Sequence, residues 1–292
     1  MVGNIMQVEG GGKMEKEYFK VMFAQMKLKL DYNEKKEYLV ADNDYFKQME
    51  MIMEKVKEND VIVFPEMSYH FKYDSYFINN SKDKIIVFGS EYIGSENYTV
   101  VYHNNKRYNI KKIFNSGVEP SIRYGVDIDV KEFFKVYLKE HTFKLKGKKF
   151  IVLNCAEYYK VAYFIARDQF KSRDVFAFLV PCANNNSEVF LTESKAIHNH
   201  NDRIYSFIVN SVSTYKGERY SLGESYVFGR VSSFEKDCLS KFRIKHSSNI
   251  CYLDDGCYLV EGMYLYKDSS VFYRSDNYRH TPKNIKIERM NF

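Results

Sequence analysis

The chain has 292 residues, of which 45% are hydrophobic and 28% charged, so it is long enough and apolar enough to form a large core. No apolar run approaches the roughly 20 residues that span a bilayer, and we expect no membrane association. The net charge of +6 comes from lysines that are spread along the sequence, often next to acids. This pattern predicts a mildly basic surface, and we do not expect a nucleic-acid partner.

The amino-terminal segment and the cysteines bear on the compartment. Residues 1–16 lack an apolar signal core and are expected to form a flexible leader, and no repeat or linker divides 17–292, which we expect to be a single domain. The five cysteines are odd in number and include no CxxC pair, a pattern typical of reduced thiols in a cytoplasm. The run HNHND at 198–202 lacks the acids and cysteines that would complete a metal site. We therefore expect a cytoplasmic protein with no metal and no cofactor.

The first part of the chain predicts parallel strands. Residues 18–25 have the pattern of a strand, 44–60 that of an amphipathic helix, and 61–64 that of a buried strand. A strand–helix–strand order favours parallel pairing, and functional groups gather at the carboxyl ends of such strands. Glu66 follows the second strand directly, in the sequence FPE. The next loop, 69–77, is rich in Tyr and Phe, which either line a pocket or pack within the loop.

The following segments predict a hairpin, a loop and a helix. Strands are expected within 84–93 and 96–114, the latter folded back on itself through the turn-forming residues HNNKR. Lys111 lies near the end of this hairpin. The loop after it is marked by glycines and a proline and carries Glu119, and a helix is expected at 129–140.

A strand that breaks straight into a helix forms the centre of the pattern. Residues 150–153 are apolar, the strand ends at Asn154 and Cys155, and a helical segment follows. The unpaired amides and positive dipole end of a helix stabilise a thiolate, which is the nucleophilic form of cysteine. A lone buried cysteine is more often a small apolar filler of a core, so this stretch by itself leaves both interpretations open.

The remaining segments continue the alternation of strands and helices. Residues 174–181 predict a strand and 188–204 a helix, with the polar loop CANNNSE between them. Strands are expected at 205–213, at 223–232 and near 257–266. This order predicts an α/β fold.

Three chemically suitable residues therefore lie at or after strand ends: Glu66, Lys111 and Cys155, spaced by 45 and 44 residues. Together they suffice for acyl transfer without a histidine. The cysteine attacks a carbonyl carbon, the glutamate moves protons, and the lysine ammonium stabilises the developing oxyanion.

The order of these motifs resembles the nitrilase superfamily of carbon–nitrogen hydrolases. The matching pieces are VIVFPEM, YNIKKIFNSGVE and FIVLNCAEYY, and the resemblance covers about residues 18 to 235. By motif, Glu66 resembles the family's general base and Lys111 its lysine. Cys155 resembles the nucleophile, and Glu119 resembles the second glutamate that supports the site in many members.

The resemblance implies a four-layer α–β–β–α sandwich and a thiol hydrolase of a non-peptide C–N bond, an amide rather than a nitrile. Cys155 would form a thioester, and Ala156, Glu157 and Asn184 are expected at the oxyanion and substrate pocket. The family commonly associates through the helical layer near the nucleophile, which implies a homodimer or a larger homo-oligomer. Two alternatives stay open: a binding or regulatory module with little turnover, and acyl transfer to an acceptor other than water.

The sequence departs from the family pattern at two points of the site. Glu157 stands two residues after the cysteine, where members often have an aspartate. Lys112 adjoins Lys111, so the lysine of the site has two adjacent candidates. Tyr108, three residues before Lys111, and Glu119, eight residues after it, favour Lys111.

Overall fold

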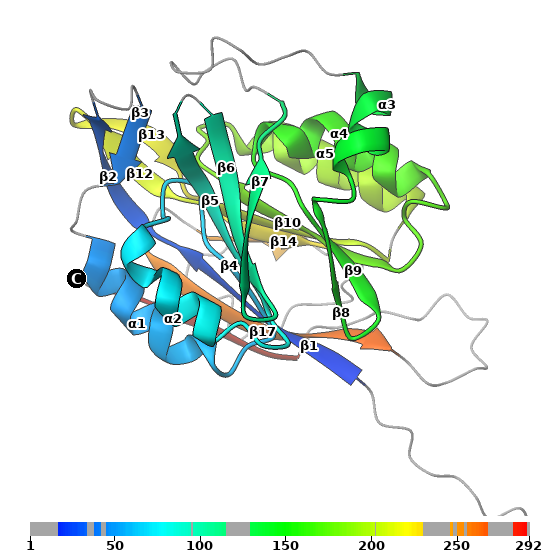
Figure 1. Ribbon diagram of the computed structural model, residues 1–292, viewed down its shortest axis with the longest axis horizontal. Helices are drawn as coiled ribbons and strands as arrows, with labels where there is room; N and C mark the ends of the chain where they lie inside the picture. The colour runs from blue at the N-terminus through cyan, green and yellow to red at the C-terminus, as the bar shows by residue number, and fades with distance from the viewer. Residues whose placement is uncertain are drawn as a thin grey trace, which may run out of the picture.

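The computed structural model describes residues 17–33, 38–41, 45–94, 96–114, 129–201, 203–229, 246–247, 250–253, 256–267 and 283–290. Within these ranges the chain forms two large β-sheets and one small sheet, with helices on the outer faces of the large sheets (Figure 1). The predicted α/β class is thereby confirmed. The expected leader, residues 1–16, lies outside the described residues.

The first large sheet contains both strands of the predicted strand–helix–strand unit. Its strands are β1 (Glu17–Gln25), β4 (Val61–Val63), β5 (Ile85–Ile93), β6 (Glu96–His103), β7 (Lys106–Lys111), β17 (Tyr258–Lys267) and β18 (Lys283–Arg289). Their order is β18-β17-β1-β4-β5-β6-β7. The central strands β1 and β4 are parallel, as predicted, and β5 pairs with β4 in the same direction. β4 is buried along its whole length, as expected of a parallel strand with both faces covered.

The second large sheet carries the predicted strand-to-helix turn. Its strands are β8 (Thr142–Leu145), β9 (Lys148–Val152), β10 (Val175–Cys182), β11 (Tyr205–Asn210), β14 (Tyr226–Phe228), β15 (His246–Ser247) and β16 (Ile250–Tyr252). Their order is β15-β16-β14-β11-β10-β9-β8. The central strands β9, β10 and β11 are parallel, so their carboxyl ends meet at one edge.

A small sheet joins the ends of the two large ones. Its strands are β2 (Lys27–Asn33), β3 (Tyr38–Ala41), β12 (Val212–Tyr215) and β13 (Glu218–Leu222). β2 follows β1 of the first sheet and β12 follows β11 of the second, and these two strands pair in parallel. The small sheet therefore connects the two large sheets at the end where β1 and β11 leave them.

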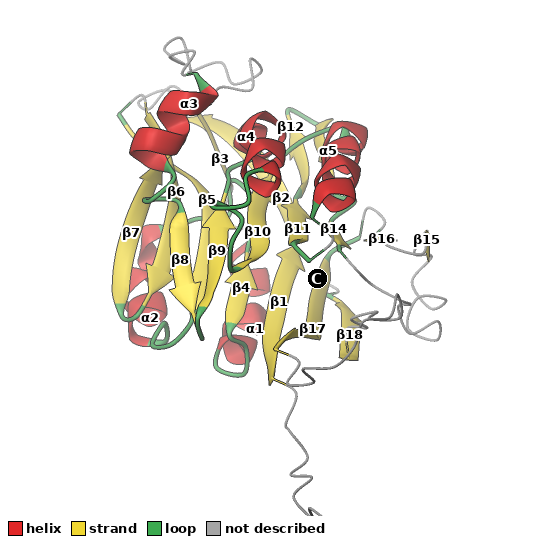
Figure 2. Cartoon of the chain, turned by 90° about the vertical axis from the view of Figure 1, so that its right-hand side faces the viewer, coloured by secondary structure: helices red, strands yellow, loops and turns green. Residues whose placement is uncertain are grey.

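Helices cover the outer face of each large sheet. They are α1 (Phe46–Val56), α2 (Asp74–Asn79), α3 (Val130–Glu132), α4 (Ala156–Arg167) and α5 (Ser187–His200). Figures 1 and 2 show α1 and α2 on one side of the molecule and α4 and α5 on the opposite side. The buried residues form three clusters. One lies between α1 and α2 and the first large sheet, one lies between the two large sheets, and one lies between the second large sheet and α4 and α5. The layers thus follow the order helices, sheet, sheet, helices.

The alternation of side chains along a strand explains how one strand serves two clusters. In β1, Phe19, Val21 and Phe23 belong to the cluster between the sheets. Met22 and Ala24 belong to the cluster under α1 and α2. Successive side chains of a strand point to opposite faces, so a shift of one residue exchanges the two faces.

Some elements differ from the sequence-based expectation. The strand expected at 205–213 is divided into β11 and β12, and the strand expected at 223–232 is described only as the shorter β14. The helix expected at 129–140 is α3, which continues as a π-helical segment to Tyr137. The elements that were not predicted include β2, β3, β13, β15, β16, β18 and α2. Such short or edge elements depend on partners that are distant in sequence.

No helix in the described part of the chain is long and apolar enough to cross a membrane.

Candidate active site

Glu66 lies just beyond the carboxyl end of β4, where its backbone joins the two large sheets. The Glu66 amide donates to the Cys182 carbonyl at the end of β10, at 3.2 Å. The side chain is buried, and both carboxylate oxygens accept hydrogen bonds. Oε1 accepts from the Lys112 ammonium and the Ser90 hydroxyl, each at 3.1 Å. Oε2 accepts from the Ala183 amide at 2.9 Å. Three donors thus hold the carboxylate in one orientation.

The bend that brings Ser90 to Glu66 depends on an interruption of β5. The pairing register of β5 with β6 shifts at this point, and Ser90 has a positive φ of 61°. Such a bulge re-aims a side chain. The neighbouring Gly89 provides the space, because a Cβ there would lie 2.8 Å from the Glu66 Cα and 2.7 Å from the Pro181 Cβ. Glycine is therefore required for the close approach of these segments.

The lysine beside Glu66 is Lys112. The Lys112 side chain is only 1% exposed, and its ammonium lies 3.1 Å from Glu66 Oε1. Lys111 is 47% exposed and pairs with Glu96 on the outer face of the hairpin. Ile110 is buried, so the period of two along β7 places residues 110 and 112 on the inner face and residue 111 on the outer one. The structure therefore places Lys112 beside Glu66, one residue from the sequence-based choice of Lys111.

Cys155 lies at the turn between β9 and α4, as the sequence predicts. It has φ 45° and ψ −103°, a backbone conformation that non-glycine residues seldom adopt. Its amide donates to the Pro181 carbonyl at 3.0 Å, which fixes the turn against β10. The residue is 6% exposed, in the cluster between the second sheet and its helices. The turn thus holds the thiol at the amino-terminal end of a 12-residue helix.

Glu157 has a different position from the one predicted. It is fully buried and, like Ala156, is not among the described residues that line the site cavity. Its Oε1 accepts from the Ile113 amide at 2.7 Å, and its Oε2 accepts from the Asn154 amide at 2.8 Å. Glu157 therefore joins the segment just after Lys112 to the turn that carries the cysteine. This is a structural role and not a pocket position.

A second thiol, which the sequence analysis did not single out, lies beside Cys155. Cys182 is the last residue of β10 and is fully buried. Burial raises the pKa of its thiol well above the ordinary value, and the neighbouring Cys155 raises that pKa further. Cys182 is therefore a neutral thiol on the strand beside the candidate nucleophile. Only the pairing of two strands brings these cysteines together, so no local sequence signal could have revealed the pair.

Cys155 and Glu66 both line one cavity of about 470 Å³. Besides Cys155 and Glu66, its wall is formed by the polar loop 183–186, the first turn of α5, Tyr159 of α4 and part of β13. Asn184 lines the cavity. Lys112 is not among the described lining residues, and its ammonium contacts the Glu66 carboxylate, which does line the cavity.

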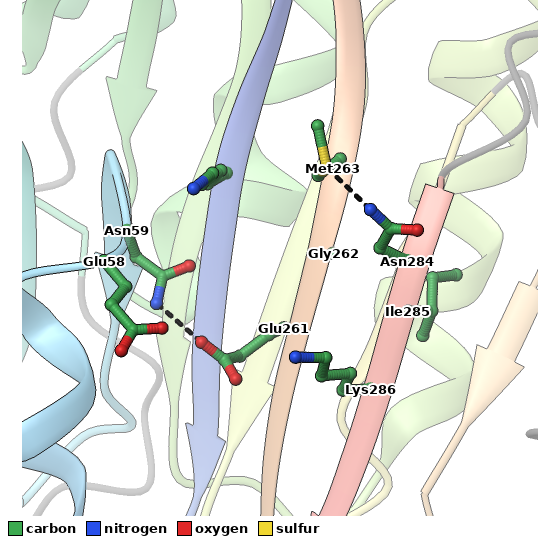
Figure 3. A pocket seen from close by; sticks show the side chains of 9 residues that line it. Glu58, Asn59, Glu261, Gly262, Met263, Asn284, Ile285 and Lys286 are labelled. Carbon is green, nitrogen blue, oxygen red and sulfur yellow. Dashed lines mark hydrogen bonds between the residues drawn. The ribbon is translucent and has the colours of Figure 1, made fainter.

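A second cavity, of about 270 Å³, lies among β1, β17 and β18 (Figure 3). Some of its polar side chains pair with one another, as in the hydrogen bond from Asn59 Nδ2 to Glu261 Oε1 at 2.8 Å. None of the described residues that line it is a cysteine, serine or histidine. It therefore offers no nucleophile comparable to that of the first cavity.

Other residues singled out from the sequence are not part of the described cavity. Glu119 lies outside the described residues. The aromatic loop 69–77 packs into the layer of α1 and α2, where Tyr73 and Phe77 are buried. His200 at the end of α5 contacts the Tyr163 hydroxyl at 2.9 Å. In the ranges that the structure describes, no group of three or more His, Cys, Asp or Glu side chains could hold a metal ion.

No protein-family model matches this sequence, and no curated protein matches it. Solved structures do resemble it. A CN-hydrolase superfamily protein from Xanthomonas campestris, with an arsenic adduct in the active site, superposes with a TM-score of 0.51 at 11% identity over 73% of this chain and 83% of that one. The chain has the CN-hydrolase fold.

Two further structures are similar at lower scores. The glutamine-dependent NAD+ synthetase from Acinetobacter baumannii has a TM-score of 0.47 at 15% identity, over 88% of this chain and 49% of that one. The NitFhit protein of C. elegans has a TM-score of 0.47 at 12% identity, over 83% of this chain and 62% of that one. These two likenesses carry no argument about the chemistry, which must come from the site of this chain.

Proposed function

We propose that this protein is a thiol-dependent hydrolase of a non-peptide C–N bond, with a small amide as its substrate. In this proposal Cys155 is the nucleophile, Glu66 the general base and Lys112 the lysine of the site. Glu119 stays a predicted supporting residue. The proposal takes Lys112 in place of Lys111 because Lys112 is the lysine that contacts Glu66.

The observation that carries the proposal is the buried pair of Glu66 and Lys112 at the cavity that also holds the Cys155 thiol. A buried carboxylate–ammonium pair is costly to form and is a weak source of net stability. Its position at a strand end, beside a cysteine with a strained backbone, favours a catalytic use over a structural one.

The proposed reaction has two steps. The Cys155 thiol gives its proton to Glu66, and the sulfur attacks the amide carbonyl carbon. The proton then passes from Glu66 to the departing nitrogen, the C–N bond breaks, and a thioester remains. Glu66 next takes a proton from water, whose oxygen attacks the thioester, and the acid leaves with regeneration of the thiol. The Lys112 ammonium and the Ala156 amide are proposed to stabilise the negative charge of each tetrahedral intermediate.

The experiment measures release of ammonia or amine across a panel of small amides and ureido compounds, with intact-protein mass spectrometry for a covalent adduct. Cys155→Ala is expected to abolish turnover and adduct formation. Cys257→Ala is the matched control, because Cys257 lies in the cluster under α1 and α2, directly before β17 of the other large sheet. A wild-type protein that forms neither product nor adduct, yet binds a ligand as well as Cys155→Ala does, would be a binding module.

The general base is tested by a second matched pair of variants. Glu66→Gln keeps the side-chain volume and an acceptor for the Ala183 amide but cannot take a proton. Loss of a positioned base costs on the order of 100- to 10,000-fold in rate. Glu96→Gln alters the exposed partner of Lys111 and should leave the rate unchanged. Added hydroxylamine separates hydrolysis from acyl transfer, because an acyltransferase should form hydroxamate in preference to acid.

The proposal includes a homodimer or larger homo-oligomer, following the resemblance of the sequence motifs. Light scattering on the purified chain gives the mass in solution. A monomer at all concentrations would remove this part of the proposal and leave the chemistry in place.

A further inference from the structure

The register of the second sheet places Cys155 and Cys182 side by side. In the parallel pairing of β9 with β10, Ile151 lies opposite Phe178 and Val152 lies opposite Leu179. The ladder continues beyond the end of β9. The Leu153 amide donates to the Leu179 carbonyl and the Cys155 amide to the Pro181 carbonyl, each at 3.0 Å. The same register, carried forward, sets Cys155 opposite Cys182.

The two thiols also lie on the same face of the sheet. Both cysteines belong to the cluster between the second sheet and its helices, and Cys155 is one of the groups that raise the pKa of the Cys182 thiol. Neighbouring strands lie about 4.8 Å apart. Disulfides usually join Cα atoms separated by about 4.4 to 6.8 Å, so a bond between these sulfurs needs little movement of the backbone.

The two thiols differ in access. Cys155 lines the cavity of about 470 Å³, whereas Cys182 is fully buried and is not among the described lining residues. A small oxidant that enters the cavity therefore meets Cys155 first. Cys182 lies directly behind it, where it can react with an oxidised Cys155 but not with the oxidant itself.

We propose that Cys155 and Cys182 are a reversible oxidation site that closes the active site through an intramolecular disulfide when the protein meets a hydroperoxide. This inference goes beyond the proposed hydrolase activity and does not depend on it. The disulfide would remove the nucleophile and protect it from irreversible oxidation to the sulfinic acid. A dithiol would restore both thiols.

The chemistry balances in two steps. The Cys155 sulfur attacks one peroxide oxygen, the O–O bond breaks, and hydroxide leaves with the thiol proton as water. Cys155 is then a sulfenic acid. The Cys182 sulfur attacks the Cys155 sulfur, and the sulfenic oxygen leaves with the Cys182 proton as a second water. The two cysteines lose two electrons and hydrogen peroxide gains them. The position of Cys182 opposite Cys155 on the neighbouring strand offsets the small thiolate fraction of a buried thiol.

The test treats the full-length protein with a small excess of hydrogen peroxide, then blocks free thiols under denaturing conditions and maps tryptic peptides without reduction. The expected product links the peptide FIVLNCAEYYK to the peptide DVFAFLVPCANNNSEVFLTESK, with a loss of two hydrogen atoms. Dithiothreitol should restore both free thiols. This readout does not require an amide substrate, so it succeeds or fails separately from the proposed hydrolase function.

Two variants complete the test. Cys182→Ser and Cys182→Ala should stop the reaction at the sulfenic acid, so labelling of Cys155 by dimedone should rise on the order of tenfold over wild type. Cys257→Ser should behave as wild type, because that thiol donates to Gln48 Oε1 in a different cluster. Dimedone labelling of wild-type Cys155 equal to that of both Cys182 variants, or a disulfide from Cys155 to another cysteine, would overturn the proposal.

Discussion

The Lys112 ammonium lies 3.1 Å from Glu66 Oε1, and these two side chains are 1% and 2% exposed. At this burial neither group can be compensated by water when its partner is removed. The adjacent Lys111 is nearly half exposed and pairs with Glu96. Lys111 and Lys112 carry the same ammonium group, one exposed and one buried, so their alanine variants form a matched pair.

We expect Lys112→Ala to be severe and Lys111→Ala to be nearly neutral. Removal of Lys112 leaves Glu66 buried without its cation, which should cost on the order of 3–5 kcal/mol in the free energy of unfolding. The rate of amide hydrolysis should fall on the order of 100- to 1,000-fold. Lys111→Ala should change the free energy of unfolding by no more than about 1 kcal/mol, because exposed ion pairs contribute little. Urea denaturation and ammonia release measure both effects. Equal losses in the two variants would contradict this assignment.

Cys155 should be alkylated faster than the other two cysteines whose side chains the structure describes. It opens to a cavity, whereas Cys182 and Cys257 are buried. Burial raises the pKa of Cys257 to about 11 and raises that of Cys182 well above the ordinary value, so both have a small thiolate fraction at neutral pH and should react slowly with an added alkylating agent. Brief treatment with iodoacetamide, followed by peptide mapping, gives the order in which the cysteines are alkylated. Labelling of Cys257 at the rate of Cys155 would return Cys155 to the role of a core filler.

Gly89→Ala should disturb the position of the base. Its new Cβ would lie 2.8 Å from both Cα and Cγ of Glu66, closer than such atoms can approach. Relief of the clash must move Glu66 or Pro181, so we expect a destabilisation of about 1–3 kcal/mol and a large loss of activity.

Gly94→Ala is the control for this substitution. Gly94 has φ +63° and open space around its Cβ position, so alanine there adds backbone strain of about 1–2 kcal/mol and no crowding. Thermal denaturation should show destabilisation in both variants, whereas the hydrolysis rate should fall in Gly89→Ala alone. A normal rate in Gly89→Ala would show that Glu66 tolerates displacement.

Glu193 on α5 should make stability depend on pH. Burial raises its pKa to about 7, against about 4.3 in an unfolded chain. The folded state then holds the proton more tightly between these values. The resulting stabilisation is therefore fully present below about pH 4 and is lost as the pH rises through about 7.

Glu193→Gln tests this pH dependence. The amide oxygen can still accept from the Tyr163 amide, which now donates to Glu193 Oε1 at 2.9 Å. At about pH 8 the free energy of unfolding of the variant should exceed that of wild type by on the order of 1 kcal/mol, after allowance for the partial exposure of the side chain. At about pH 4 the two free energies should differ little. Thermal melts across this range measure the difference. Glu54→Gln, an exposed change on α1, is the control, and a profile of Glu193→Gln parallel to wild type would refute the prediction.

The sequence by itself determined the elements that carry the site. A continuous apolar run ending in FPE predicts a buried strand with Glu66 at its end, and the structure has β4 there. A second run that breaks into a helical pattern predicts Cys155 at a strand-to-helix turn, and the structure has β9 and α4 on either side of it. These features are local, because the pattern of neighbouring apolar and polar residues predicts both a buried strand and a helix.

Only the tertiary structure decided which polar groups meet. The choice between Lys111 and Lys112 depends on which face of the hairpin turns inward, and a shift of one residue reverses that face. Glu157 lies two residues after the cysteine, but its carboxylate accepts from the backbone amides of Ile113 and Asn154. The position of Cys155 opposite Cys182 follows from the register of two parallel strands, which is set by packing of the whole sheet. Such pairings join residues far apart in sequence, so local pattern does not contain them.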